Sequence, residues 1–350
     1  MTEILCFNAK EAPEELWRAY YEYRAILNKE ISPDDPLPAS SEHKKILELL
    51  ASDLQQEHVP YLLLSNGESG RVIGYGKLMC EKLTSPSYEK NKKTGVIDLS
   101  IHPRFRRKGY GTKLFHFLLE ELKARSPGAA QAEVKTLQPS GKAFLEKHGG
   151  RVDQVRSRSR LYLNSVDWWR VAGGLSDLEN SSPGTGLELA PVVPERDIEE
   201  FSRVYTEVIN QQPFGEAGPD FIYTPGRMRK EDASFKEAGV ERWFVYAREP
   251  DGRISGFSEI LHILSPGHRI DQGLTGVREE YRGRGLGKIL KCRMLLHIKE
   301  RYPAARFIST ASATDNPWML AINEWLGFTP YSQRTSYLFP LRPCERPPLV

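Results

Sequence analysis

The sequence is poor in cysteine and lacks long apolar runs. Its 350 residues include four scattered cysteines, without the close pairs of a zinc site or the even framework of a disulfide-rich domain. Such usage suits free thiols in a reducing compartment. No apolar run approaches the ~20 residues that cross a membrane as a helix. These observations exclude the disulfide-rich secreted, zinc-finger and membrane-spanning classes, and we expect no metal site. The cysteines are Cys6, Cys80, Cys292 and Cys344.

The sequence also lacks an excess of charge of one sign. Lysine and arginine total 49, aspartate and glutamate total 46, and the formal net charge is +3. A nearly balanced charge gives no electrostatic basis for binding nucleic acid. Near the N-terminus, Glu3 and Lys10 enclose only a short apolar run, unlike the pattern of a secretion signal. We expect a cytoplasmic protein, a monomer or a homodimer, that binds neither nucleic acid nor membrane.

What the sequence does contain is a strand–turn–helix pattern rich in arginine and glycine. Within Gln272–Met294, an apolar run ends at Val277, the turn Arg282–Gly287 follows, and apolar residues then recur at helical spacing. Glycines let backbone N–H groups approach a ligand closely, and the start of a helix favours a bound anion. Arginines add charge-assisted hydrogen bonds to phosphate. The pattern predicts a turn that binds pyrophosphate.

The same pattern occurs earlier in the chain. Val96–Leu119 also reads as an apolar strand, the turn Arg106–Gly111 and an apolar-periodic helix. Gly109 and Gly285, which take the same place in the two turns, are 176 positions apart. An internal repeat of this length predicts two copies of one module.

These turns resemble the acyl-CoA pyrophosphate loop of the GCN5-related N-acetyltransferase (GNAT) superfamily, whose pattern is Gln/Arg-x-x-Gly-x-Gly/Ala. The resemblance covers roughly residues 3–165 and 187–340. It implies that acetyl-CoA binds as a co-substrate, with the phosphates on the turns and the pantetheine arm beside the asparagine of a later Asn-Pro-Trp-Met segment. The implied contacts of the first copy are Ile101, Arg106, Arg107, Lys108, Gly109, Tyr110, Gly111 and Thr112. Those of the second are Val277, Arg282, Gly283, Arg284, Gly285, Leu286, Gly287, Lys288 and Asn316.

The resemblance implies an α/β (α+β) fold of two tandem GNAT modules, each a mixed, mostly antiparallel sheet flanked by helices. We place the first module at residues 1–165 and the second at 187–340, with a flexible tail over 341–350. Residues 166–186 are interpreted as a linker. Because Asp177–Gly186 is rich in Asn, Ser, Pro and Gly and has no apolar periodicity, it is expected to be flexible.

The two modules differ where the chemistry would occur. Acetyl transfer needs a base that deprotonates the acceptor ammonium and an acid that protonates the leaving thiolate. Alignment of the modules places Asp271 opposite Gly95 and Glu259 opposite Lys77, so the second module alone has two carboxylates on adjacent strands of the expected acceptor cleft. Asp271 is the nearest match to the glutamate that often serves as base in the family. Alternatively, both carboxylates are solvated strand residues paired with arginine, and His262 is a further candidate base.

A second difference lies near the end of each module. Many members of the family carry a tyrosine there as the acid for the coenzyme A thiolate, and here the matching positions hold Asn323 and Leu145. Asn323 can donate a hydrogen bond to sulfur but not a proton, so that a water, Tyr331 or Tyr337 would have to serve as the acid. Leu145 can donate neither a hydrogen bond nor a proton to the sulfur. We therefore interpret the first module as degenerate and the second as catalytic.

The sequence thus indicates an N-acetyltransferase that moves an acetyl group from acetyl-CoA to a primary amine of a small molecule. The candidate catalytic residues are Asp271, Glu259 and Asn323, all in the second module. The loop Gln211–Thr224, with its three aromatic residues, is expected to lie over the acceptor cleft. The alternative is a protein that binds acyl-CoA as a sensor or scaffold without turning it over.

Overall fold

The structure is a computed structural model. It describes residues 2–35, 37–51, 53, 55–65, 70–263 and 267–341, with the side chains of 177–179 left aside. The chain divides into two compact units. The first unit comprises residues 1–155, 215–220 and 334–350, and the second comprises 156–214 and 221–333. Residues 342–350 of the expected flexible tail lie outside the described residues.

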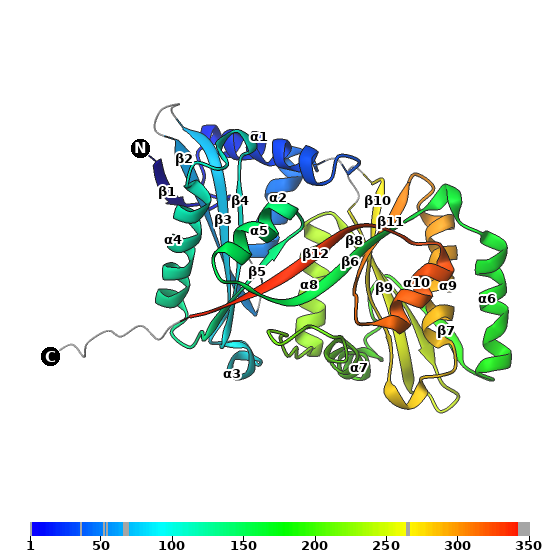
Figure 1. The fold of residues 1–350 in the computed structure, drawn as a ribbon. Helices are drawn as coiled ribbons and strands as arrows, with labels where there is room; N and C mark the ends of the chain where they lie inside the picture. Colours follow the sequence, from blue (N-terminus) through cyan, green and yellow to red (C-terminus); the bar gives the residue numbers. More distant parts are fainter. Residues whose placement is uncertain are drawn as a thin grey trace. The chain divides into compact units, whose positions relative to one another are not determined.

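The first unit is built on a mixed sheet with the strand order β1-β2-β3-β4-β5-β12. Neighbouring strands are antiparallel except β4 and β5, which run parallel. The strands are β1 (Thr2–Cys6), β2 (Gln56–Ser65), β3 (Arg71–Glu81), β4 (Thr94–Ile101), β5 (Gln131–Thr136) and the end of β12 (Thr329–Pro340). The helices are α1 (Glu14–Ile31), α2 (Ser40–Ala51), α3 (Tyr88–Asn91), α4 (Tyr110–Arg125) and α5 (Pro139–Lys147), with a short 3-10 helix at Pro103–Phe105 (Figure 1).

The second unit repeats this plan with the strand order β6-β11-β10-β9-β8-β7. Here β10 and β11 are the parallel pair. The strands are the end of β6 (Arg151–Tyr162), β7 (Gly186–Ala190), β8 (Val240–Arg248), β9 (Ile254–Ile263), β10 (Arg269–Val277) and β11 (Phe307–Ala313). The helices are α6 (Trp168–Ser181), α7 (Ile198–Asn210), α8 (Pro225–Glu237), α9 (Leu286–Arg301) and α10 (Pro317–Leu326), with 3-10 helices at Leu163–Ser165 and Glu279–Tyr281.

The last strand of each sheet comes from the other half of the sequence. β6 follows the first repeat, yet from Arg156 onward it belongs to the second unit and pairs with β11. β12 ends the second repeat, yet from Arg334 onward it belongs to the first unit and pairs with β5. The structure therefore departs from the simple division at residues 165 and 187, because repeat patterns in a sequence do not reveal which sheet a terminal strand joins.

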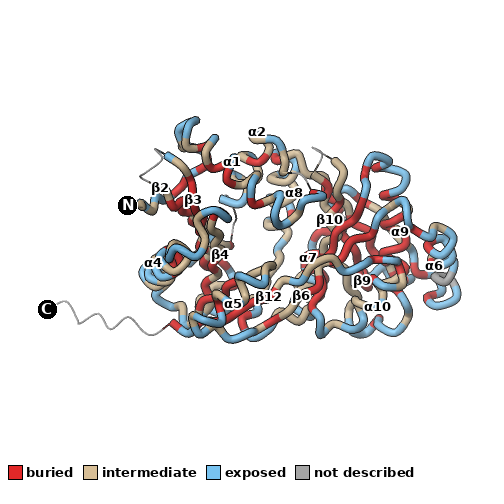
Figure 2. The backbone as a smooth tube through the Cα atoms, turned by 45° about the horizontal axis from the view of Figure 1, so that its top comes forward, coloured by how far each residue is buried: buried red, intermediate tan, exposed pale blue. Residues whose placement is uncertain are grey.

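Buried strands and one long helix form the core of the second unit. On one face of its sheet, the buried side of α9 packs against β8, β9 and β11, together with α6 and α10. On the other face, α7 and Met228 of α8 cover a second cluster that includes Phe244, Phe257 and Leu274. The buried strand segments are drawn in red in Figure 2. Burial of apolar area on both faces fixes the orientation of every strand residue.

The prediction of a linker over residues 166–186 is wrong in one respect, because residues 168–181 form helix α6, which packs on α9. Trp168, Val171 and Leu175 follow one another at helical spacing and face the core. A Cβ atom on Gly174 would lie 2.9 Å from the Cys292 Sγ, so this glycine allows the two helices to approach closely. The glycine pair and the polar end of the segment conceal this periodicity in the sequence.

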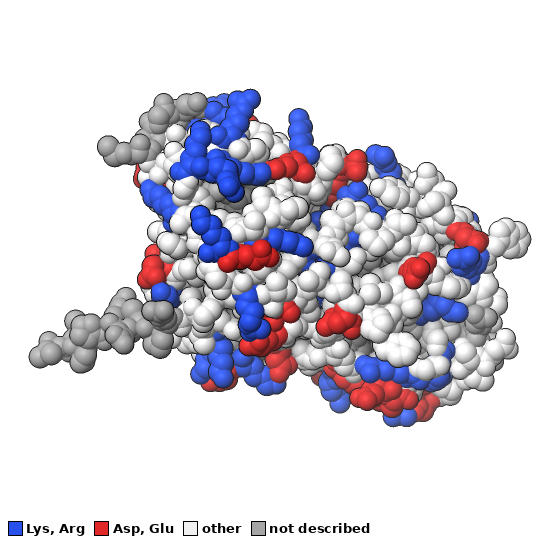
Figure 3. Space-filling view, viewed as in Figure 1, with Lys and Arg blue, Asp and Glu red and all other residues white. Residues whose placement is uncertain are grey.

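The surface carries both signs of charge, as the nearly balanced composition requires. On the face drawn in Figure 3, lysine and arginine side chains are interspersed with aspartate and glutamate. None of the helices in the described part of the chain is long and apolar enough to span a bilayer.

Candidate active site

Both phosphate turns have the backbone shape that their glycines predict. Gly109 and Gly285 adopt left-handed conformations, with φ of 82° and 73°, and each directly precedes a helix, α4 or α9. The N-cap residue of each helix is thus a glycine, which has no side chain to bond the helix start. The first N–H groups of both helices therefore remain oriented for an anion, as a pyrophosphate requires.

The last glycine of each turn permits close approach by a ligand. A Cβ atom on Gly111 would have Phe144 as its nearest neighbour at 3.5 Å, and one on Gly287 would have Ile322 at 3.4 Å. These are ordinary contact distances within the protein, so the folded chain itself tolerates a side chain there. A requirement for glycine at these two positions would thus come from a ligand lying against the turn.

The arginines of the turns have different surroundings. Arg282 donates to the carbonyl of Val277 and to the side chain of Gln211, at 3.3 and 2.5 Å. Arg106 forms a two-point ion pair with Glu30, both contacts at 2.6 Å, and these hydrogen bonds lower the pKa of that carboxyl.

The remaining cations of the turns are also placed by the structure. Arg284 is directed away from the turn, with contacts at 2.9–3.0 Å to Ser182, Thr185 and Glu249. Lys288 lies over the ring of Trp325, and Lys108 lies over that of Phe105. Arg284 thus has a visible structural role beside the phosphate contact expected of it.

The parallel strands of both sheets separate beside these turns. In the second unit, β10 and β11 pair only over Arg269–Asp271, although β11 continues to Ala313 along β6. In the first unit, β4 and β5 pair only over Thr94–Ile97. Each sheet therefore opens between two neighbouring strands at the end nearest its phosphate turn, which is where the pantetheine arm is expected.

A β-bulge distinguishes the second unit at this opening. The pairing of β10 with β9 shifts between Gln272 and Thr275, so that Gly273 and Leu274 have no register partner on β9. The Leu274 N–H donates to the Glu259 Oε1 at 3.0 Å. A Cβ atom on Gly273 would lie 2.6 Å from the Glu259 Cγ, so the bulge requires glycine there. The corresponding pair β3–β4 of the first unit runs without a shift.

Glu259 is at the centre of a buried polar network. Its second oxygen accepts from the Arg242 guanidinium at 2.7 and 3.0 Å, and its first also accepts from the Tyr205 hydroxyl at 2.8 Å. Burial, and then the negative charge of Glu259, raise the pKa of Tyr205 well above its usual value, so this hydroxyl stays a donor.

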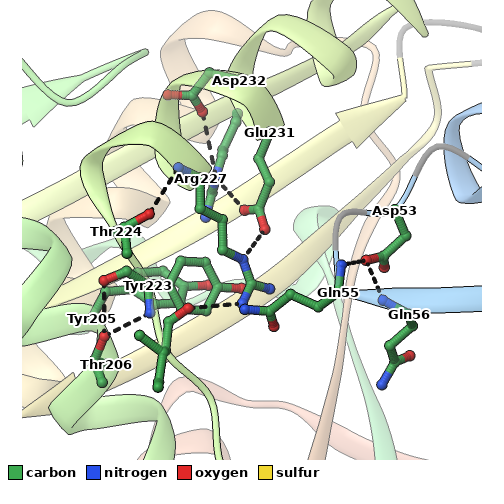
Figure 4. A network of polar contacts seen from close by, with 12 residues as sticks. Asp53, Gln55, Gln56, Tyr205, Thr206, Tyr223, Thr224, Arg227, Glu231 and Asp232 are labelled. Carbon is green, nitrogen blue, oxygen red and sulfur yellow. Dashed lines mark hydrogen bonds and ion pairs between the residues drawn. The ribbon is translucent and has the colours of Figure 1, made fainter. Parts of the chain in front are cut away.

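Two acids on α8 extend the network. Glu231 and Asp232 each lie 3.4 Å from Arg242. Burial raises the pKa of Asp232 to about 6. Figure 4 shows Glu231 and Asp232, with Arg227 lying over the Tyr223 ring and bonded to Glu231.

Asp271 has a more open setting than Glu259. It is the last residue of β10 that pairs with β11, directly at the opening of the sheet. Its Oδ1 accepts from Arg269 at 2.6 and 2.9 Å, and the side chains of the two residues are 34% and 30% exposed. His262, the other candidate base, is buried, lies against Tyr302 and contacts the carbonyl of Gly267 at 3.0 Å.

The two asparagines of the α10 segment are both engaged. The Asn316 Oδ1 caps α10 by accepting from the Met319 N–H at 3.1 Å. Asn323 is buried, and its side chain joins α9 to β11: the Lys291 Nζ donates to its Oδ1 at 2.6 Å, and its Nδ2 donates to the Ser312 Oγ at 3.2 Å.

Lys291 is a functional candidate that sequence reasoning missed. Its side chain is buried on α9 among apolar residues, and burial lowers its pKa to about 7. The signal was a lysine on the apolar face of a helix, one turn beyond the phosphate turn. A second missed feature is a row of arginines on β6, which sequence alignment had assigned to the first module.

The first unit lacks the polar groups of this site. Lys77 takes the place of Glu259 and pairs with Asp98 at 3.4 Å, and Leu145 is buried in the core. The bulge also shifts the alignment of β10 with β4 by one position. Leu261 of β9 pairs with Asp271, whereas Met79, the counterpart of Leu261 in the first unit, pairs with Val96. The counterpart of Asp271 is therefore Val96 rather than Gly95, because β10 contains the extra residue.

The chain is similar to proteins of known family along most of its length. The profile of the acetyltransferase (GNAT) family matches residues 14–149. The mycothiol acetyltransferase of Arthrobacter sp. (strain FB24) is 24% identical over 259 residues, which cover 70% of both chains. That of Mycolicibacterium paratuberculosis is 25% identical over 320 residues, covering 84% of this chain and 88% of the relative.

Solved structures show the same architecture. A tandem GNAT protein from the clavulanic acid biosynthesis pathway matches with a TM-score of 0.77 and 20% identity, over 99% of this chain and all of the other. A GCN5-related N-acetyltransferase from Sphaerobacter thermophilus matches with a TM-score of 0.66 and 19% identity, over 98% and 96% of the two chains. Together with the paired turns and the opened sheets, these similarities support a tandem GNAT protein that resembles the mycothiol acetyltransferases, with the family profile itself matching residues 14–149.

Proposed function

We propose that the second unit transfers an acetyl group from acetyl-CoA to the primary amine of a small molecule. The observation that carries this proposal is the bulge of β10, which lies at the opening of the second sheet and has no counterpart on β4. The first unit has an intact phosphate turn, but Lys77, paired with Asp98, stands where the second unit has Glu259, and Leu145 stands where it has Asn323. We therefore infer that it contributes structure and, at most, acyl-CoA binding.

The bulge supplies a hydrogen-bond donor for the thioester carbonyl. Successive backbone N–H groups of a strand point to opposite edges. The bulge interrupts this alternation at Gly273 and Leu274. The Leu274 N–H is bound by Glu259, and we propose that the neighbouring Gly273 N–H faces the opening. In our proposal this N–H stabilises the negative charge that develops on the carbonyl oxygen during attack. Glu259 then holds the bulge in shape rather than accepting the proton.

Asp271 is our candidate for the general base. It is partly exposed at the mouth of the opening, where its Oδ1 accepts two hydrogen bonds from Arg269. It takes a proton from the acceptor ammonium, directly or through a water. The amine lone pair then forms the C–N bond, and collapse of the tetrahedral intermediate breaks the C–S bond.

Lys291 is our candidate for the acid that protonates the leaving thiolate. Asn323 stands where many members of the family carry the acidic tyrosine, and the Lys291 ammonium lies directly behind it at 2.6 Å. An ammonium has three donors, so two remain after the bond to Asn323. A pKa of about 7 lets this group give up a proton near neutral pH.

The proposal is tested by measuring thiol release from acetyl-CoA with pooled primary amines. We expect at least one pool to stimulate release, and Asp271→Asn to reduce the stimulated rate by about 100-fold or more, the usual contribution of a general base. Asp98→Asn is the matched control, because it removes a strand carboxylate paired with a cation in the first unit. Equal loss in both variants would refute the assignment.

The alternative function is an acyl-CoA sensor without turnover. It predicts that acetyl-CoA binds stoichiometrically while no amine pool stimulates thiol release. The engaged side chains of Asn316 and Asn323 are compatible with either function, whereas the bulge favours catalysis.

A further inference from the structure

Three arginines of β6 project from one face of the second sheet. Ser309, Ala311 and Ala313 of β11 pair with Arg160, Arg158 and Arg156 of β6, and Ser309 also pairs with Asp271. Residues paired on neighbouring strands share a face of the sheet. The three arginines and the candidate base therefore lie on the same face, with only small, uncharged side chains of β11 between them.

This is the face that α7 and α8 cover farther along the sheet. Asp271 pairs with Leu261, and Leu261 pairs with Arg242, which shares its face with the α7-covered residues Phe244 and Tyr246. The opposite face carries α9 and its phosphate turn. The arginine row thus lies on the face of the sheet opposite α9. This is the face from which an acceptor amine would reach Asp271.

Aromatic rings hold the arginines in place. The Tyr331 ring centre lies 4.1 Å from the Arg160 guanidinium carbon and 5.0 Å from that of Arg158. Arg156 lies 5.7 Å from the centre of the Phe214 ring and donates to the Gln212 side chain at 3.3 Å. Stacking orients a guanidinium while leaving its edge N–H groups directed sideways.

Such a row concentrates positive charge. Alternate residues of a strand are about 6.6 Å apart, and a guanidinium remains charged at every physiological pH. Three guanidinium groups at this spacing together attract an anion that lies over the row. Arg160 is only 3% exposed, so its charge lies in a region where such interactions are strong.

We propose that this row binds an acidic group of the acceptor, so that the substrate is an amine that also carries a carboxylate or a phosphate. The inference rests on the proposed function and deepens it. Arg160 and Asp271 are two strands apart, about 10 Å between backbones. An acid group bound over the row therefore places an amine a few bonds away within reach of Asp271. The strand that sets acceptor choice then comes from the first half of the chain.

A binding measurement tests the site without any acetyl transfer. Malonate and inorganic phosphate are titrated by calorimetry into the full-length protein saturated with coenzyme A, which occupies the phosphate turns. We expect one of the two anions to bind, and the double variant Arg156→Gln/Arg158→Gln to bind it at least tenfold more weakly. The preferred anion distinguishes a carboxylate from a phosphate acceptor.

Arg301→Gln is the matched control, because Arg301 lies at the end of α9 and pairs with Glu241. It should bind the anion as the wild type does. The variants leave Arg160 intact because it is buried, and the thermal midpoint of each verifies its folding. Absence of anion binding to the wild type, or equal binding to the double variant, would overturn the proposal.

Kinetics then separate this proposal from the proposed function. Thiol release is compared for pools of amines that carry a carboxylate, a phosphate or no acid group. We expect an acidic pool to be preferred, and the double variant to raise its KM at least tenfold while the KM for acetyl-CoA is unchanged. An uncharged pool that reacts equally well would refute the arginine row as a specificity site. Anion binding without turnover of any pool would refute the acetyl transfer and leave the anion site standing.

Discussion

Glu259 and Asp271 lie on the same face of the second sheet but have opposite surroundings. Glu259 is 5% exposed and accepts from an arginine, a tyrosine and a backbone N–H, which leaves it little capacity as a base. Asp271 is partly exposed at the opening of the sheet. The two acidic residues look alike in the sequence. Only their burial and their hydrogen-bond partners distinguish a structural carboxylate from a candidate catalytic one.

Substitution of the two carboxylates should therefore have different effects on stability. Glu259→Gln leaves Arg242 buried without its closest partner, and we expect the free energy of unfolding to fall by about 3 kcal/mol. Asp271→Asn breaks a partly exposed pair and should cost less than about 1 kcal/mol while removing activity. Urea unfolding followed by circular dichroism measures both. Similar losses of stability would contradict this distinction.

Lys291 should make the stability of the fold depend on pH. Its pKa is about 7 in the folded chain and about 10.4 in an unfolded one, so between these values only the unfolded chain binds the proton. The free energy of unfolding should rise with pH across this window, and it should not change below pH 7 on account of this group.

Lys291→Met lacks this titration. Relative to the wild type, the variant should be most stable below pH 7, and its advantage should shrink by several kcal/mol toward pH 10. The unsatisfied Asn323 Oδ1 adds a constant cost of about 1–3 kcal/mol. Urea unfolding at pH 6, 8 and 10 measures the difference. A difference that does not change with pH would show that Lys291 is not held neutral by burial.

At the residue scale, the sequence predicted what depends on local chemistry. The spacing of the glycines predicts a tight turn before a helix, and Gly109 and Gly285 adopt the left-handed conformation of such a turn, while their contact with phosphate stays a prediction. Lys291 was not found, because its significance depends on the apolar residues that surround it in the fold. The role of Arg284 was equally hidden, since its partners Ser182, Thr185 and Glu249 are distant in sequence.

At the scale of elements, strong periodicity predicted most helices and strands. The apolar spacing within Pro13–Lys29 is typical of a helix, and α1 spans Glu14–Ile31. A helical pattern also covers Glu42–His58, but α2 ends at Ala51, because the sheet takes Gln56 onward as β2. The bulge of β10 could not be predicted, since one extra residue in a strand has no periodic signature and depends on Glu259 across the ladder.

Two adjacent glycines of α6 provide a test of how this helix packs. A Cβ atom on Gly173 would have no neighbour within 4 Å, whereas one on Gly174 would lie 2.9 Å from Cys292 and 3.0 Å from Trp325. Both substitutions raise helix propensity equally. We expect Gly173→Ala to stabilise the chain by about 0.5–1 kcal/mol and Gly174→Ala to destabilise it by about 1–2 kcal/mol. Thermal unfolding measures both, and equal shifts would contradict the packing of α6 on α9.

At the scale of the whole molecule, the exchanged strands tie the two halves of the sequence together. β12 contributes Tyr337 and Phe339 to the core of the first unit, and β6 contributes Leu161 to that of the second. The sequence predicted two modules from the repeated turns, since each turn is local. The exchange was not predictable, because equivalent terminal strands have the same pattern whichever sheet they join.

The exchange predicts that neither half folds alone. A chain of residues 1–165 lacks the strand that pairs with β5, and a chain of 187–350 lacks the strand that pairs with β11. Each would expose a sheet edge and part of its core, and we expect both to be insoluble or unfolded by circular dichroism. Co-expression of the two halves should restore a soluble complex. A folded, monomeric half would contradict the exchange.

The central claim is that acetyl transfer takes place in the second unit, and the two phosphate turns offer its most direct test. Gly111→Val and Gly287→Val place the same side chain at matched positions, each with ordinary space in the fold for the Cβ atom. Acetyl-CoA-dependent thiol release with the stimulating amine pool is measured for both, with the thermal midpoint as the check on folding. The account predicts that Gly287→Val abolishes release and Gly111→Val retains most of it. Loss of release in Gly111→Val, with Gly287→Val active, would place the chemistry in the first unit and contradict the account.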